Sequence, residues 1–583
     1  TYGTNGFHLP FSDNSAATAT TLGKDTSGNG NNWTPNNLSV TAGAGNDSLV
    51  DSPTNGIASS GGDAGGVVVG NYATLNPLET LWTRATLSNG NLEASSNWAA
   101  STIRFPASGK YYAEFTLSSF SASENWIGAS TGTGNYLVYT RLGRIETTGG
   151  STVTTVSTYT IGDVIGVAVN IDSLTVAFYK NGTQVYSGTY DATGRMLAVY
   201  ADGATWVANF GQRPFAMSGG APAGYKSLNT ANLPTPMILK GSSYFDVKTY
   251  TGNGGTQNIS GLGFSPDLVW IKNRAAAVSH YLQDVVRGTY AYMSSNSTGS
   301  ENTSSGADWF STFDSTGFTV KYGSTGFGNS AGWNENGTAY AAWCWDGGSS
   351  TVTNTQGSIT STVRANASAG FSIVGWVNDG SASIKTCGHG LGVTPSLVIV
   401  RNRSTTDNWL VISPTLFSTP ARDYMFLNLT DAKASVGSDY WSFSSTTFGV
   451  QQSARGSNGN NMIAYCFAPV SGYSSMGSYT GNGSTDGPFV YTGFRPRWVL
   501  IKRSDVSGDN WFLFDTSRDT YNVGYLFLLA SASTAENTTA YTAIDILSNG
   551  FKLRSGNLGW NASGGTYCFA CFAENPFSIA RAR

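Results

Sequence analysis

The chain has 583 residues, a length that suits about four or five domains. Only 11% of the residues are charged, 13% are aromatic and 72 are glycine, which favours twisted β-sheets with short turns and excludes a disordered or coiled-coil chain. The formal net charge is −3 with scattered basic residues, so no basic stripe is available for nucleic acid, and no apolar run reaches the roughly 18 residues of a membrane span. We therefore predict an all-β protein of several β-sandwich domains, without nucleic-acid binding or membrane insertion.

Residues 1–71 are predicted to form a β element followed by an arm rich in glycine, asparagine and serine. A strand is expected at 7–13 and a turn at 22–33. Within this turn, side-chain oxygens alternate as in a calcium loop, at Asp25, Ser27, Asn29 and Asn31. Asn36 stands where an EF-hand needs its twelfth-position glutamate, so a plain turn without metal is expected, with calcium binding as the alternative.

Residues 72–217 are predicted to form one compact β domain. Alternation of apolar and polar residues indicates half-buried strands at 111–117 and 125–129, and apolar runs follow at 163–172 and 174–180. The last run enters Asn181-Gly182, a strong signal for a two-residue hairpin.

Five motifs of this domain follow one another in the order typical of a known module, namely residues 109–114, 126–129, 162–168, 178–182 and 209–211. The domain resembles a SPRY (B30.2-like) domain, a β-sandwich recognition module. The resemblance implies binding through loops at one end of the sandwich and no catalysis. Because these loops vary between SPRY domains, it assigns no ligand-binding residue.

The segment 218–243 is rich in glycine and proline and is predicted to be a semi-rigid, extended linker. Three copies of one domain are predicted beyond it: repeat 1 at 244–360, repeat 2 at 361–472, and repeat 3 with a short tail at 473–583.

The repeats share a turn with a conserved proline followed by a β-rich run and basic residues, at 263–274, 392–403 and 493–503. Aromatic triplets with a central cysteine close the copies: Trp343-Cys344-Trp345, Tyr465-Cys466-Phe467 and Tyr567-Cys568-Phe569. With roughly 100 residues each, the copies are large enough to own a core, so separate modules arranged like beads on a string are expected.

Few residues of this chain point to enzymatic chemistry. The three histidines, His8, His280 and His389, lie in different predicted domains, which leaves a Ser-His-Asp or Cys-His site without support. The five cysteines are expected to be buried thiols without zinc. Carboxylate pairs for glycoside hydrolysis can be drawn at Glu114 with Glu124 and Asp163 with Asp172, but alternation places most of these acids on solvated faces. A non-enzymatic protein without a cofactor is predicted.

Aromatic side chains are the alternative source of a binding site, because exposed rings stack on sugars. Trp409 and Trp511 recur at one position of the repeats, and His280 lies near that position in repeat 1, so a packing role is predicted for all three. The predicted ligand candidates are three aromatic residues expected in loops: Tyr136, Tyr281 and Tyr521.

The Asn/Gly-rich opening, the SPRY-like domain, the repeats and the ending at 572–577 together resemble virion appendage proteins of tailed bacteriophages, of the tail-fibre type. The resemblance implies a place in the virion, contacts with other virion proteins, a homotrimer and attachment to a host cell-surface glycan or protein. The alternatives are a structural capsid or tail decoration protein without a receptor role and, less favoured, a capsule depolymerase.

Overall fold

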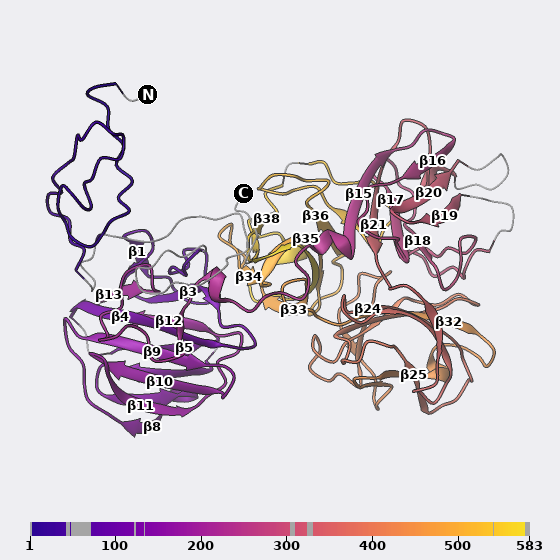
Figure 1. The fold of residues 1–583 in the computed structure, drawn as a ribbon. Helices are drawn as coiled ribbons and strands as arrows, with labels where there is room; N and C mark the ends of the chain where they lie inside the picture. Colours follow the sequence, from indigo (N-terminus) through magenta and orange to yellow (C-terminus); the bar gives the residue numbers. More distant parts are fainter. Residues whose placement is uncertain are drawn as a thin grey trace. The chain divides into compact units, whose positions relative to one another are not determined.

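The computed structural model describes residues 3–41, 47, 71–121, 124–132, 134–303, 309–322, 330–539 and 541–577 (Figure 1). The chain divides into two compact units, unit 1 (Thr1–Thr235) and unit 2 (Pro236–Arg583). Strands dominate both units, and α1 (Leu558–Asn561) is the one α-helix in the described ranges. The predicted all-β fold with several sandwiches is confirmed. None of the described helices has the length and apolar character to cross a membrane.

Short 3₁₀ turns connect some of the strands: η1 (Thr148–Gly150), η2 (Thr230–Asn232), η3 (Gly241–Ser243), η4 (Ser330–Gly332) and η5 (Gln452–Ala454).

The N-terminal residues 3–41 contain no strand, so the strand predicted at 7–13 is wrong. The backbone N–H of His8 donates to the Asp25 carboxylate at 2.8 Å, and the His8 carbonyl accepts from the Thr26 N–H at 2.8 Å. The turn at 22–33 therefore supplies hydrogen-bond partners for the His8 backbone, which pairing with a neighbouring strand would otherwise provide. The predicted arm lies mostly outside the described residues.

Unit 1 contains two sheets. The larger has the order β1-β2-β13-β4-β9-β10-β11, with β14 paired to β4. Its strands are β1 (Thr86–Ser88), β2 (Glu93–Ser95), β13 (Ala204–Asn209), β4 (Lys110–Phe120), β9 (Val164–Asn170), β10 (Thr175–Lys180), β11 (Thr183–Thr189) and β14 (Lys226–Ser227). The smaller sheet consists of β3 (Trp98–Arg104), β12 (Met196–Ala201), β5 (Asn125–Ser130), β6 (Tyr136–Thr140), β7 (Arg144–Thr147) and β8 (Ser151–Thr155), in that order.

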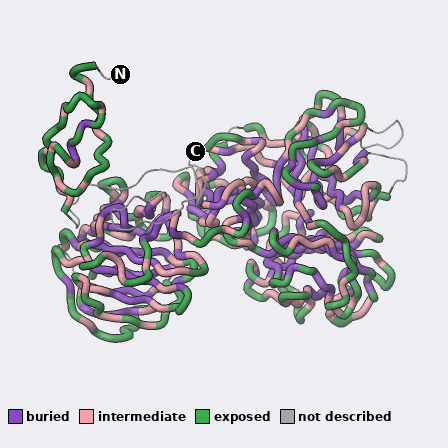
Figure 2. The backbone as a smooth tube through the Cα atoms, viewed as in Figure 1, coloured by how far each residue is buried: buried purple, intermediate pink, exposed green. Residues whose placement is uncertain are grey.

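The two sheets of unit 1 pack face to face as a β-sandwich. Tyr139 of β6 and Phe178 of β10 meet across the interior with ring centroids 5.8 Å apart. In Figure 2 the strands are largely buried and the turns between them exposed. The predicted hairpin joins β10 to β11, with positive φ angles of 48° at Asn181 and 81° at Gly182.

The segment predicted as a linker is ordered over most of its length. Strand β14 pairs with β4, and Leu228 is fully buried, so residues 226–232 belong to the packed body of unit 1. Ser227, Asn229 and Asn232 form side-chain hydrogen bonds among themselves, which satisfy polar groups that a free linker would expose to water. The boundary between the units falls after Thr235.

Unit 2 contains three pairs of sheets, which correspond to the three predicted repeats except that strand β22 of the second pair lies before the predicted boundary at 360/361. The first pair comprises β15 (Phe245–Thr251), β21 (Ala339–Trp345), β17 (Leu268–Asn273) and β18 (Tyr281–Asp284) against β16 (Thr256–Ile259), β20 (Gly317–Lys321) and β19 (Phe310–Asp314). The second comprises β22 (Thr351–Asn354), β23 (Ser361–Asn366), β24 (Phe371–Val377), β32 (Asn461–Phe467), β26 (Leu397–Asn402), β27 (Leu410–Ile412), β28 (Asp423–Phe426) and β29 (Ala434–Ser435) against β25 (Ile384–Gly388), β31 (Thr447–Gln451) and β30 (Trp441–Phe443). The third comprises β33 (Ser474–Thr480), β40 (Thr566–Pro576), β35 (Phe494–Arg503), β36 (Trp511–Asp515) and β37 (Leu528–Leu529) against β34 (Phe489–Tyr491), β39 (Gly550–Leu553) and β38 (Ile544–Leu547).

The three pairs, called segments 1, 2 and 3, have one strand order in common. The orders β15-β21-β17-β18, β24-β32-β26-β27 and β33-β40-β35-β36 correspond strand by strand, as do the three smaller sheets. Segment 2 differs by the hairpin β22–β23, which pairs with the outer edge of β24.

Strand register corrects the alignment of the closing triplets. Cys344 and Cys466 lie opposite Val269 and Val398, and the corresponding Val499 lies opposite Cys571, not Cys568. The triplet of segment 3 is therefore Ala570-Cys571-Phe572. The match of Tyr567-Cys568-Phe569 to an aromatic–Cys–aromatic pattern misled the sequence alignment by three residues.

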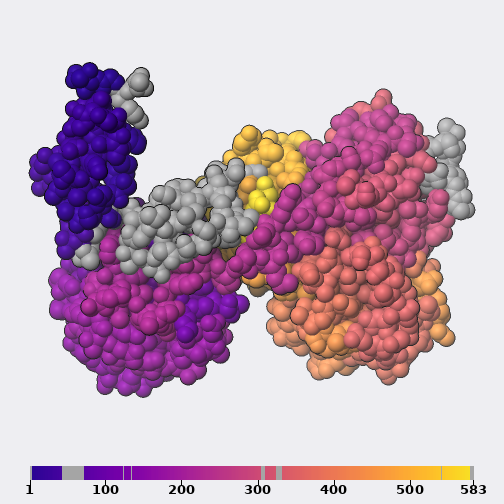
Figure 3. Space-filling model, viewed as in Figure 1, coloured from indigo at the N-terminus to yellow at the C-terminus, as the bar shows by residue number. Residues whose placement is uncertain are grey.

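Each central strand is buried on both faces, which explains its uninterrupted apolar sequence. Val269 and Ile271 of β17 face the smaller sheet of segment 1, whereas Leu268 and Trp270 face a core common to all three segments. The common core includes Trp345, Phe467, Trp498 and Phe572 from different segments. The segments therefore pack around one centre, and the expected beads on a string are wrong. In Figure 3 the atoms of unit 2, from magenta through orange to yellow, form one continuous body.

The segments contact one another at three corresponding junctions, which close a ring. At each junction a ring N–H donates to a carbonyl of another segment: Trp409 to Ser294 (2.8 Å), Trp511 to Phe426 (2.9 Å) and His280 to Leu529 (2.9 Å). Because the partner of His280 Nε2 is a carbonyl, this nitrogen carries the proton. The predicted packing role of all three residues is confirmed.

Two of the three junctions also contain a buried Asp–Arg ion pair that accepts a hydrogen bond from the neighbouring segment. Arg287 pairs with Asp284, which accepts a hydrogen bond from Tyr465 of segment 2 at 2.8 Å. Arg518 pairs in the same way with Asp515, which accepts from Trp343 of segment 1 at 3.0 Å. At the third junction, Ser413 and Leu416 occupy the positions of the acid and the arginine. One fold thus accepts either an ion pair or an apolar contact at this position.

Removal of one partner of a buried charge pair leaves the other charge uncompensated. We expect Arg287→Leu to lower the free energy of unfolding by about 3–5 kcal/mol. The measurement is the guanidinium unfolding transition of the full chain. The matched control, Asp284→Ser with Arg287→Leu, installs the pair found at the third junction and is expected to lose clearly less. An equal loss in both variants would contradict the ion-pair argument.

Two buried lysines at corresponding positions give a pH prediction. Burial lowers the pKa of Lys272 and of Lys502 from 10.5 to about 8. Between these pH values the unfolded chain binds protons that the folded chain has released, so the free energy of unfolding rises with pH. The buried thiols, whose pKa values are raised, act in the opposite direction at high pH, so the lysine contribution is measured as a difference: the free energy of urea unfolding of the parent minus that of the double variant Lys272→Met with Lys502→Met is expected to rise from pH 7.5 to 10. Parallel pH profiles for both proteins would refute the assignment.

Candidate ligand-binding site

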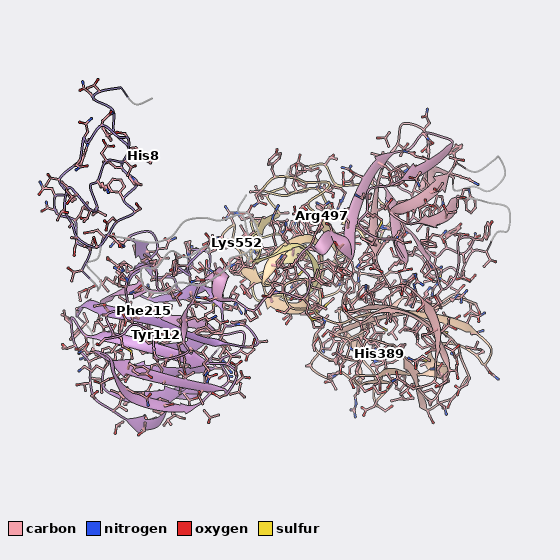
Figure 4. All side chains as sticks on the ribbon, viewed as in Figure 1. His8, Tyr112, Phe215, His389, Arg497 and Lys552 are labelled. Atoms are coloured by element: carbon pink, nitrogen blue, oxygen red, sulfur yellow. The ribbon has the colours of Figure 1, made fainter. Side chains whose placement is uncertain are left out.

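The two outer faces of the unit 1 sandwich differ in what covers them. Over the larger sheet, Phe215 packs on Tyr112 with ring centroids 5.0 Å apart (Figure 4). Glu114 beside it accepts hydrogen bonds from the backbone N–H groups of Ala216 (2.6 Å) and Met217 (2.9 Å). The chain after β13 is therefore fixed on this face and covers it.

The outer face of the smaller sheet carries a cluster of large rings, here called the aromatic face: Trp82, Trp98, Trp126, Tyr136 and Tyr200. Alternation within the strands produces it, because residues two apart in a strand share a face. Tyr200 of β12 lies between Trp98 of β3 and Trp126 of β5 in register. The small residues Ala100 and Ala198 are buried beneath the rings, which leaves room for the rings to cover the sheet.

The rings of the aromatic face contact one another continuously. Trp82 stacks on Trp98 with centroids 4.8 Å apart and an interplanar angle of 16°. Trp98 contacts the edge of Trp126 at 4.6 Å, and Tyr136 stacks on Trp126 at 5.9 Å. Trp126 is buried with 8% exposure, whereas the other four rings are half-buried. The cluster thus has one supporting ring and four that reach the surface.

Polar groups border the aromatic face. Arg144 of β7 forms ion pairs with Glu124 and Glu146, each at 2.8 Å. The Tyr136 hydroxyl accepts a hydrogen bond from the Gly150 N–H at 2.9 Å, which fixes the ring orientation. Flat rings bordered by charged and amide groups are suited to a ligand with an apolar face and hydroxyl edges, the chemistry of a sugar ring.

The structure separates the three tyrosines predicted as ligand candidates. Tyr136 belongs to the aromatic face. Tyr281 lies in strand β18 rather than in a loop, and it is 1% exposed and stacked on Trp333 at 4.7 Å. Tyr521 lies in a loop of segment 3 and is 80% exposed. The three tyrosines form no common site, because Tyr136 belongs to unit 1, whereas in unit 2 Tyr281 is buried and Tyr521 is exposed.

The predicted calcium-loop residues lie together, but hydrogen bonds from backbone N–H groups occupy the carboxylate oxygens of Asp25. Its carboxylate accepts from the backbone N–H groups of His8, Ser27 and Asn31, which hold the pKa of Asp25 down at about 2 against the effect of desolvation. The side-chain amides of Asn29 and Asn31 donate to carbonyls of residues 3–6. Within the described residues, no group of three or more His, Cys, Asp or Glu side chains is placed to hold a metal.

The carboxylates considered for catalysis are occupied by separate structural partners. Burial raises the pKa of Glu114, which anchors the covering segment, while Glu124 pairs with Arg144 on the other sheet. Asp163 holds Asn181 at the hairpin, and Asp172 accepts from the Gly109 N–H. Each acid thus has a local structural partner.

The five cysteines and two of the three histidines considered for chemistry are buried, whereas His8 is exposed. Burial raises the pKa of the thiols of all five cysteines, which form no disulfide: Cys344, Cys387, Cys466, Cys568 and Cys571. Burial lowers the pKa of His280 and His389, so both are neutral at pH 7.

These observations define an all-β protein with an aromatic face on its first unit and a ring of three sheet pairs as its second. The family model described as "Domain of unknown function (DUF7483)" matches residues 240–576, and the chain belongs to this family. No curated protein matches the chain.

Several solved structures are similar to part of the chain. The SPRY domain of human HERC1 has 18% identity and a TM-score of 0.20, covering 23% of this chain and 96% of that one. The PSpry domain of TRIM65 has 11% identity and a TM-score of 0.20, covering 24% and 90%. The carbohydrate binding module CBM66 from Bacillus subtilis has 8% identity and a TM-score of 0.18, covering 24% and 93%.

Sequence reasoning found Tyr136 but missed Trp82, Trp98, Trp126 and Tyr200. The sequence contained part of the signal for the aromatic face. Trp98 and Tyr200 each stand two residues from an alanine in an apolar stretch, so each ring shares a strand face with a small residue. Which face of a sandwich is covered depends on the path of the chain after β13, and the residues of the strands do not encode that path.

Truncation of the supporting ring is expected to lower the free energy of unfolding more than truncation of a surface ring. We expect Trp126→Ala to lower the free energy of unfolding by about 3–5 kcal/mol, since it removes a buried ring packed against three others. Trp82→Ala, which removes a half-buried ring at the edge, is expected to lose much less. Thermal unfolding of both variants checks this, and equal losses would disprove the division into supporting and surface rings.

Proposed function

We propose that this protein is a non-enzymatic bacteriophage virion protein, a tail fibre or related appendage that attaches to a host-surface glycan. The observation that carries the binding role is the aromatic face of unit 1, where four half-buried rings lie uncovered by the described chain beside a polar border. Stacking on the flat faces of sugar rings supplies modest affinity for each contact. Many copies on one particle raise the avidity.

The place in the virion is supported by the resemblance of nearly the whole chain to tail-fibre-type appendages. Within that proposal, the common strand order of segments 1, 2 and 3 supports three tandem repeats of one domain. Their partners are other virion proteins on one side and a cell-surface glycan or protein on the other. The protein is proposed to act outside the cell as part of the particle.

A homotrimer of the full chain is also proposed from that resemblance. The ring of unit 2 already places three related sheets around a common core within one chain, so a trimer uses surfaces outside this core. Size-exclusion chromatography with multi-angle light scattering at micromolar concentration tests the oligomeric state directly. A stable single-chain mass would remove the homotrimer from the proposal.

The binding proposal is tested with the full chain on an array of bacterial glycans and on intact cells with and without periodate oxidation of their sugars. We expect saturable, periodate-sensitive binding. Trp98→Ala is expected to weaken it at least about fivefold, because truncation of a contact aromatic typically costs more than 1 kcal/mol.

The matched control is Tyr521→Ala, which removes an exposed ring of unit 2 and is expected to leave this binding unchanged. If no glycan and no cell binds while the protein still assembles into particles, the attachment role fails and a structural decoration role takes its place. Release of sugar fragments from capsule would instead support a depolymerase.

A further inference from the structure

Unit 2 contains a groove of about 730 Å³ where segments 1 and 2 adjoin. Tyr244 and Phe264 line it on the side of segment 1, together with Asp346 directly after β21. Arg364 of strand β23 and the turn with Asn366 and Ser368 line the side of segment 2. The groove thus combines aromatic walls with charged, amide and hydroxyl groups, the composition of a site for a small polar ligand.

The polar groups of the groove are held in place by one another. Arg364 Nη2 lies 2.8 Å from Asp267 Oδ1, and the other Asp267 oxygen accepts from the Gly347 N–H at 2.7 Å. The Asn366 amide donates to Asp346 at 3.1 Å. Arg364 Nε is buried and has no hydrogen-bond partner among the described residues.

The other segments show that the fold does not require these acids. Strand register places Ser396 and Arg497 at the position of Asp267, and Ala468 and Ala573 at the position of Asp346. Burial raises the pKa of Asp267 to about 6, an unfavourable placement that segment 2 avoids with a serine.

The hairpin β22–β23 that supplies Arg364 is likewise an addition to the common strand order. The groove is therefore assembled from features that segment 1 and segment 2 have beyond the shared fold. Buried ionisable groups that the fold does not need are candidates for function.

Charge narrows the class of ligand. The groove lining has one acidic side chain, Asp346, and one basic side chain, Arg364, and Arg364 is already paired with the buried Asp267, so no uncompensated positive charge is available for a sulfated, phosphorylated or uronic-acid ligand. We propose that the groove binds a neutral saccharide, with Asp346 and Asn366 hydrogen-bonded to ring hydroxyls and Tyr244 packed against the sugar ring. This site is separate from the aromatic face and does not depend on it.

The test uses the full chain and saturation-transfer difference NMR with three neutral probes, maltohexaose, cellohexaose and mannohexaose, and with hexagalacturonate as the anionic counterpart. At least one neutral probe is expected to bind, and hexagalacturonate is not. Asp346→Ala is expected to weaken neutral binding at least tenfold. Alanine stands at the corresponding position of the other two segments, so this variant is expected to fold.

A second variant, Ser368→Trp, fills the groove from an exposed turn without removing any of these hydrogen bonds, and it is expected to abolish binding. Trp98→Ala on the aromatic face is the matched control and is expected to have no effect on this site. The proposal is overturned if no neutral probe binds, if both groove variants bind as the parent does, or if hexagalacturonate binds as tightly as the neutral probes. Loss of binding with Trp98→Ala alone would assign the sugar to the aromatic face instead.

Discussion

The paired polar groups at the junctions of unit 2 make its common apolar core possible. The central strands are apolar on both faces, but the sheet edges bring a ring N–H group into the same interior at all three junctions and an ion pair at two of them. Asp284 with Arg287 and Asp515 with Arg518 neutralise each other without exposure to water. Unpaired, any of these groups would cost several kcal/mol, on the order of the stability of a whole domain.

Aromatic residues have different structural roles in the two units. In segment 1, Trp343, Trp345 and Trp270 are all buried in the common core, so the abundance of aromatic residues in unit 2 is largely structural. Unit 1 uses a similar set of side chains differently. There the rings of Trp98 and Tyr200 lie on an outer face that the described chain leaves partly open. The same side-chain chemistry therefore supports a core in one unit and a surface in the other.

Comparison of the three segments also distinguishes positions with a role common to all segments from positions whose residues occur in one segment alone. His280 differs in residue type from Trp409 and Trp511 but makes the same cross-segment hydrogen bond. By contrast, Asp267 and Asp346 occur in segment 1 alone, beside a hairpin that belongs to segment 2 alone. Comparison within one chain thus identifies candidate binding groups without any second protein.

The sequence by itself determined the all-β class, four strands of the unit 1 sandwich, the Asn181-Gly182 hairpin and the packing role of His280, because these follow from local periodicity, turn chemistry and the alignment of the repeats. It misplaced the segment 3 triplet at Cys568, and it predicted Tyr281 in a loop. Only the tertiary structure decided that the three segments share one core and that one sandwich face keeps its rings at the surface. Both outcomes depend on contacts between residues hundreds of positions apart, and strand alternation is the same whether the partner is a sheet, a neighbouring segment or water.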